Sequence, residues 1–176
     1  MNDSSESRET SVANSSKALD DLYTTLDELD SIHEAAHAVL TVALMGASFH
    51  CVELPYPTSA GSGGGRSRRF DRGDDSTALI IGMAGAGAEI LHRPDIGWSW
   101  TSRFQSSARG DWKLAQEKIN RLALNGDRKQ VIKDAKAKTL TYLAGHWDWV
   151  LSVASALRKY RYLGYHEVVI LRNQPL

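Results

Sequence analysis

Residues 32–40 read Ile32-His33-Glu34-Ala35-Ala36-His37-Ala38-Val39-Leu40, a run dominated by residues that favour an α-helix. On a helix, side chains four positions apart project from one face with Cβ atoms about 6 Å apart, so His33 and His37 should lie side by side. Two neutral imidazoles at this spacing can bind a single Zn²⁺. Glu34 cannot bind the same metal head-on, but it can accept a proton from a water on that metal. The segment therefore predicts the core of a zinc hydrolase.

The alternative for these two histidines is an amphipathic helix in which neighbouring groups satisfy them by hydrogen bonds. The residues around them make the helix apolar on almost every side, which is typical of a buried helix. Two adjacent histidines are costly to bury without partners, and a metal ion supplies one. The context favours the metal site.

The whole chain has the composition of a globular protein. Its 176 residues suggest one domain with a substantial core, and its zero formal net charge gives no general attraction to nucleic acid or to an anionic membrane. Cys51 is the single cysteine, which excludes internal disulfides and fits a reducing compartment. The N-terminus has no signal-peptide pattern, and the apolar run 35–45 is too short to span a bilayer. We expect a cytoplasmic protein with no nucleic-acid or membrane partner.

The hydrophobic pattern predicts a mainly α (α+β) fold, in which a small β element packs beside the metal helix. Residues 1–16 are polar and Ser-rich, and we expect a disordered arm followed by a single domain over residues 17–176. Apolar residues at helical spacing predict helices at 17–29, 31–45, 77–91, 111–124, 127–143 and 147–160. Residues 49–54 alternate as in a strand, and the Gly- and Arg-rich segment 58–75 is expected to be a loop.

A catalytic zinc site needs three protein ligands and an open fourth position for water. Spacing alone leaves the third ligand open, because it can come from any part of the fold. Glu89 lies among Ala and Gly residues and would need a cationic or hydrogen-bonding partner if buried. Asp111 stands where a helix is expected to begin, and would otherwise be an ordinary capping residue. The main candidates are His50, His92, His146, Glu89 and Asp111.

Four segments, in order, resemble the peptidase part of the FtsH family of AAA+ membrane zinc proteases. Residues 32–39 resemble its H-E-A-G-H-A motif, and residues 81–89 (IGMAGAGAE) resemble its GG-x-A-A-E helix. Residues 107–115 (SARGDWKLA) resemble its G-A-S-x-D-x-x-x-A segment, and residues 147–171 resemble its closing stretch. The resemblance covers about residues 30–172.

This resemblance implies a zinc metalloendopeptidase. It assigns His33, His37 and Asp111 as zinc ligands, Glu34 as the catalytic base, and Glu89 as a carboxylate that orients a ligand. Ala36 replaces the glycine of the family motif, and the segment between Glu89 and Asp111 is longer than usual.

This sequence contains neither a P-loop nor a transmembrane segment. We therefore expect cleavage of flexible or unfolded polypeptides without ATP, unless a separate ATPase partner supplies the motor. Homo-oligomerisation stays open.

Two further regions could contact a substrate. The strand at 49–54 could accept an extended peptide as an added strand through Val52, Glu53 and Leu54, although a plain core strand is the alternative. Trp98 and Trp100 lie in a loop and could line a pocket, although packing is the default.

Two functions other than a working peptidase are left open. One is a peptidase-like fold that binds a protein partner without cleaving it. The other is a helical interaction domain in which the histidine motif is accidental.

Overall fold

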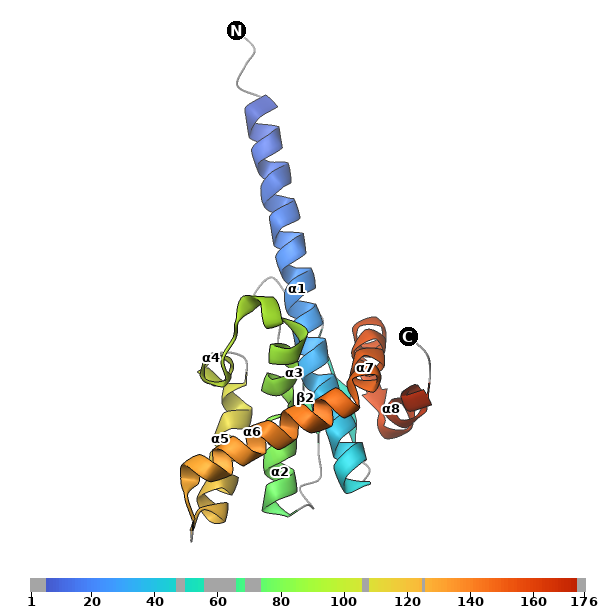
Figure 1. The fold of residues 1–176 in the computed structure, drawn as a ribbon. Coiled ribbons are helices and arrows are strands. Elements are labelled where there is room, and N and C mark those ends of the chain that lie inside the picture. The colour runs from blue at the N-terminus through green and yellow to red at the C-terminus, as the bar shows by residue number, and fades with distance from the viewer. Residues whose placement is uncertain are drawn as a thin grey trace.

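The computed structural model describes residues 6–46, 50–55, 66–68, 74–105, 108–124 and 126–173. Within these ranges the chain is mainly helical with one small three-stranded sheet, which confirms the predicted fold class. Figure 1 shows α1 running through the middle of the molecule, with α2 and α3 beside it and α6 crossing in front. None of the helices in these ranges combines the length and apolar character needed to cross a bilayer.

Helix α1 (Glu6–Met45) carries the two histidines and is longer than the sequence pattern predicted. The expected break at Ser31 is absent, and the helix extends back to Glu6, inside the segment for which we expected disorder. The segment has no glycine or proline to interrupt it, and the Ser31 hydroxyl donates to the Glu28 carbonyl at 2.6 Å instead of capping a new helix. The N-terminal part of α1 projects away from the other helices (Figure 1). At the other end Gly46, with a φ of +54°, follows Met45 and terminates the helix at the predicted boundary of residue 45.

The sheet has the order β2-β1-β3, with β1 (Cys51–Glu53) in the centre between β2 (Arg66–Arg68) and β3 (Tyr162–Gly164). Both pairings are antiparallel, and Val52 lies opposite Ser67 on one side and Leu163 on the other. The prediction of a loop over residues 58–75 is wrong for residues 66–68, which form β2. Residues 58–65 and 69–73 of that segment lie outside the described ranges.

The central position of β1 contradicts the predicted substrate contact through Val52, Glu53 and Leu54. Both edges of β1 are already paired, and the Leu54 amide donates to the Arg161 carbonyl at 2.8 Å. Val52 and Leu54 are buried in the core. The alternative of a core strand is correct.

The glycine- and alanine-rich segment after β2 forms two short helices where one was predicted. Helix α2 (Asp75–Gly82) begins at Asp74, whose carboxylate accepts from the amides of Ser76 and Thr77, and helix α3 (Ala84–His92) follows after Met83. The Met83 amide donates to the carbonyls of Leu79 and Ile80, which tightens the helix at this point.

The C-terminal half matches the predicted helices closely. Helix α5 (Arg109–Leu122) starts and ends two residues before the predicted bounds. Asp127 caps α6 (Arg128–Gly145), which runs two residues beyond the predicted end, and α7 (Trp147–Tyr160) has the predicted bounds. The expected loop between Glu89 and Asp111 contains the short helices η1 (Pro94–Ile96) and α4 (Trp100–Gln105). Helices α8 (Tyr165–Ile170) and η2 (Leu171–Asn173) follow β3.

Buried apolar side chains form two clusters. The first is built on α1 and α7, and the second joins α4, α5 and α6. Helices α2 and α3 contribute to both, with Ile80 and Ala84 in the first cluster and Leu79 and Ala86 in the second. The second cluster brings the start of α5 towards the histidine face of α1.

Candidate metal centre

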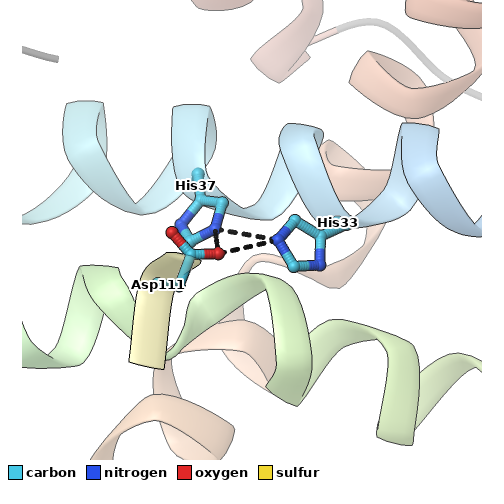
Figure 2. A group of neighbouring side chains, drawn as sticks. All are labelled: His33, His37 and Asp111. Carbon is cyan, nitrogen blue, oxygen red and sulfur yellow. Dashed lines mark hydrogen bonds and ion pairs between the residues drawn. The ribbon is translucent and has the colours of Figure 1, made fainter. Parts of the chain in front are cut away.

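His33 and His37 lie side by side on α1, as their spacing predicted. Both are buried, and their Nε2 atoms are 3.2 Å apart (Figure 2). Their rings meet edge to face, with centroids 4.9 Å apart. The two ring nitrogens thus face one point between α1 and the neighbouring helices.

Asp111 reaches the same point from the first turn of α5. Its Oδ2 atom is 2.9 Å from His33 Nε2 and 3.0 Å from His37 Nε2 (Figure 2). Within the part of the chain that the structure describes, these three residues form the cluster of donor atoms that could hold a metal ion. Spacing could not choose a third ligand, and the geometry agrees with the choice that the family resemblance implied.

Two of the other candidates for the third ligand have different surroundings. His92 contacts Glu28 at 3.3 Å, and His146 lies between α6 and α7 with its ring against Trp149. His50 is exposed.

The outer nitrogen of each imidazole has an acceptor of its own. His33 Nδ1 lies 2.6 Å from Glu89 Oε1, and His37 Nδ1 lies 2.8 Å from the Ile81 carbonyl oxygen. Carbonyl and carboxylate oxygens accept hydrogen bonds, so each Nδ1 carries a hydrogen and donates it. In the neutral rings, the Nε2 lone pairs therefore point at each other and at Asp111. Metal-binding histidines typically have such outer partners, which fix the ring and its tautomer.

The carboxylates around the two histidines favour a positive charge at the point where the two Nε2 atoms and Asp111 meet. Burial alone would lower the pKa of His33, but hydrogen bonds with Asp111 and Glu89, and the charge of Glu34, raise it to about 10. Burial alone would raise the pKa of Asp111, but the imidazoles of His37 and His33 hold it well below its usual range. Three acceptor atoms around one point need a shared positive charge, either a proton or a metal ion. Two imidazoles and a carboxylate form a donor set that a metal ion can accept.

Glu34 is adjacent to His33 and is also buried on α1. Its negative charge acts on His33 strongly enough to contribute to the raised pKa. The Glu34 carboxylate therefore lies close enough to His33 to favour a positive charge there.

Gly85 on α3 makes room for the His33 ring. A methyl group added at Gly85 would lie 2.3 Å from His33 Nε2 and 2.4 Å from His33 Cε1, well inside van der Waals contact. The sequence did not show which glycine of this helix faces a candidate ligand. An amino acid with any side chain at this position would displace the ring.

Glu89 holds His33 in the way that the resemblance implied, and the structure adds a residue that the sequence did not suggest. Glu89 is 1% exposed, and its Oε2 atom pairs with the Nη2 atom of Arg103 on α4. No motif marks Arg103, because a lone arginine in an expected loop has no pattern. Both tryptophans considered for a substrate pocket make packing contacts: the Arg103 guanidinium lies over Trp98, and Trp100 packs against Phe104.

The sequence matches no protein-family model and no curated protein sequence. The family assignment therefore stays a prediction from the four motif-like segments.

Proposed function

We propose that the chain is a zinc-dependent endopeptidase of the FtsH type that hydrolyses peptide bonds in flexible or unfolded polypeptides. The observation that carries the proposal is the convergence of His33, His37 and Asp111 on one point. Glu34 follows His33 on α1, and its charge acts on that ring. Two imidazoles and one carboxylate match the ligand sets of catalytic zinc sites, which use three protein ligands. A site that only stabilised the fold would more often have four protein ligands.

Zinc held by these three side chains would activate water and stabilise negative charge on a carbonyl oxygen. Glu34 would accept a proton from the attacking water as the new C–O bond forms. It would then return that proton to the amide nitrogen as the C–N bond breaks, so that an acid and an amine leave. Glu34 thus acts as base and then as acid, and its burial beside His33 suits a group that must exchange protons away from bulk water.

An extended substrate would have to add to an outer strand of the sheet, because β1 is paired on both sides. The outer strands are β2 and β3. Such a substrate must already be unfolded, or a separate ATPase must unfold it. Cleavage without ATP is expected for casein and for short peptides.

The test compares wild type with Glu34→Gln in zinc content and in casein hydrolysis. We expect both proteins to bind zinc, and hydrolysis by the variant to fall by about 10²- to 10⁴-fold, the range that a general base contributes. Glu28→Gln is the matched control, because Glu28 lies on the same helix but contacts His92. The control should retain full activity.

Equal hydrolysis by wild type and Glu34→Gln would contradict the proposal, since a contaminating protease would explain it. Zinc binding without hydrolysis by either protein would favour the protein-binding module. Absence of zinc binding by wild type would favour the helical interaction domain.

A further inference from the structure

We propose that Arg103 is a positioning residue for the metal centre, which acts on His33 through Glu89 and is itself held in place by Trp98. This inference rests on the proposed metal site, and the evidence for it lies in the contacts of α4.

The two carboxylate oxygens of Glu89 are divided between two partners. Oε1 accepts from His33 Nδ1 at 2.6 Å, and Oε2 pairs with Arg103 Nη2. The side chains of Glu89 and Arg103 are 1% and 11% exposed, so water competes little for either group. Because the guanidinium fixes one oxygen, the carboxylate cannot rotate freely, and the direction of its bond to His33 is set.

Trp98 fixes the guanidinium from the other side. The Arg103 Cζ atom lies 4.0 Å from the centre of the Trp98 ring, a distance that gives a cation–π contact. A planar guanidinium can pair with a carboxylate through its edge and stack on a ring through its face. Lysine offers a point charge instead, so Arg103→Lys should replace arginine only in part.

Helix α4 also contacts the segment that carries Asp111, through the Arg103 carbonyl and the Phe104 side chain. The Arg103 carbonyl accepts from the amide of Ala108, the residue that precedes α5. The next side chain, Phe104, stacks on Trp112 with ring centroids 4.6 Å apart, and Trp112 follows Asp111. Helix α4 thus contacts the outer partner of His33 and the start of the helix that carries Asp111.

The alternative is that Arg103 simply compensates the buried charge of Glu89 and contributes to stability alone. The two roles differ in the property of the protein that loss of Arg103 would change. A stability role lowers the unfolding temperature of the metal-free protein and leaves the zinc affinity of the folded protein unchanged. A positioning role lowers the zinc affinity of the folded protein and acts through Glu89.

The experiment measures zinc affinity by competition with a chromophoric chelator for wild type, Arg103→Gln, Glu89→Gln and the double variant. We expect each single variant to lose about 10- to 100-fold in affinity, the range for outer partners of metal ligands. The double variant should lose no more than Glu89→Gln alone, because both changes break the same connection. The visible spectrum of the Co²⁺-substituted protein should change in Arg103→Gln, since the ring of one ligand is reoriented.

Arg93→Gln is the matched control, because Arg93 pairs with Asp95 near the surface and lies outside the connection to His33. Its zinc affinity should equal that of wild type. Unchanged affinity in Arg103→Gln, or losses that add in the double variant, would overturn the positioning role while wild type still binds zinc. Absence of zinc binding by wild type would remove the metal site itself, and this inference with it.

Trp98→Leu provides the second variant if Arg103→Gln does not fold. It keeps the ion pair and removes the ring beneath the guanidinium. We expect a smaller loss of zinc affinity, about 3- to 10-fold, below the range for loss of the outer partner itself. An affinity equal to that of wild type would overturn the proposal by this route.

Discussion

The two apolar clusters supply the candidate metal centre in different ways. The cluster around α1 and α7 presents two histidines from one buried helix, fixed relative to each other by a spacing of four residues. The cluster around α4, α5 and α6 presents a single carboxylate in the first turn of α5, and the Asp111 side chain is 19% exposed. The first half of the site is set by local geometry, whereas the second depends on how the two clusters pack together.

Helices α2 and α3 contribute to both clusters. Their direct contacts in the site are with the two histidines. Their Ile81 carbonyl and Glu89 carboxylate accept from the two imidazoles, and their Gly85 makes room for one ring. Asp111 instead depends on the packing of the buried residues Ala115 and Ile119 farther along α5. A bound metal ion would therefore connect an already ordered pair of ligands to a ligand carried by the other cluster.

The strongest way to break the histidine half of the site is Gly85→Ala. The added methyl group would occupy the position of the His33 ring, so the ring must leave the site or α3 must move. We expect zinc affinity to fall by more than the roughly 100-fold typical for loss of an outer partner. We also expect a loss of about 1–3 kcal/mol in the free energy of unfolding from overpacking. Chelator competition and urea unfolding measure the two effects.

Gly82→Ala is the matched control for that substitution. Gly82 ends α2, and a methyl group there would meet no atom within 4 Å. The change should leave zinc affinity unaltered, and stability should stay equal or rise slightly because alanine favours a helix. Zinc binding by Gly85→Ala as tight as by Gly82→Ala would contradict the place assigned to His33.

Asp111→Asn breaks the other half of the site and tests whether a metal joins the two clusters. At free zinc equal to 100 times Kd, wild type should gain about 2.7 kcal/mol of stability. For a chain of this length this corresponds to about 5–10 °C in Tm. Asparagine keeps the shape of the side chain but lacks its charge, so most of this increase should be lost. A full zinc-dependent increase in Asp111→Asn, measured by differential scanning calorimetry, would show that the carboxylate is not a ligand.

The same division explains what the sequence could predict. The pair His33 and His37 could be read from sequence, because both lie within one turn of one helix and the geometry is local. Spacing physics left the third ligand among five main candidates, because it depends on the packing of separate helices. The choice of Asp111 required the resemblance to a family.

The wrong or missing predictions concern a polar N-terminal helix and contacts between distant segments. Residues 6–16 have the composition of a disordered arm, yet they form the first turns of α1. The residues of β2 look like loop in isolation and become a strand because β1 offers an edge to pair with. Arg103 and Gly85 come close to Glu89 and His33 only through the packing of separate helices, so no pattern along the chain distinguishes them from other arginines and glycines.

The pH dependence of zinc binding should follow the protons that the metal displaces. In the metal-free protein the pKa of His33 is raised to about 10, so the folded state holds this proton at neutral pH. The raised pKa adds stability that is fully present below the unfolded value of about 6.5 and is lost as the pH rises through about 10.

Zinc requires the deprotonated ring, so its affinity should rise about tenfold per pH unit below pH 10, until hydroxide competes. Isothermal titration in buffers of different ionisation enthalpy measures the released proton; a pH-independent affinity between pH 6.5 and 8.5 would contradict this expectation.

The smallest expected effect comes from loosening the second cluster without touching a ligand. Ile119→Val removes one buried methyl group from α5, two turns after Asp111, and should cost about 0.5–1.5 kcal/mol of stability. Because Asp111 is positioned by the packing of α5, we also expect zinc affinity to fall severalfold, but by less than the roughly 10-fold lower limit for loss of an outer partner. Ile80→Val makes the same change in the first cluster, where the histidines are fixed by their spacing and outer partners. It should lower the free energy of unfolding by as much as Ile119→Val does, but it should leave zinc affinity unchanged. Equal zinc affinities for the two variants, measured by chelator competition at matched folded fractions, would show that both clusters position the ligands alike.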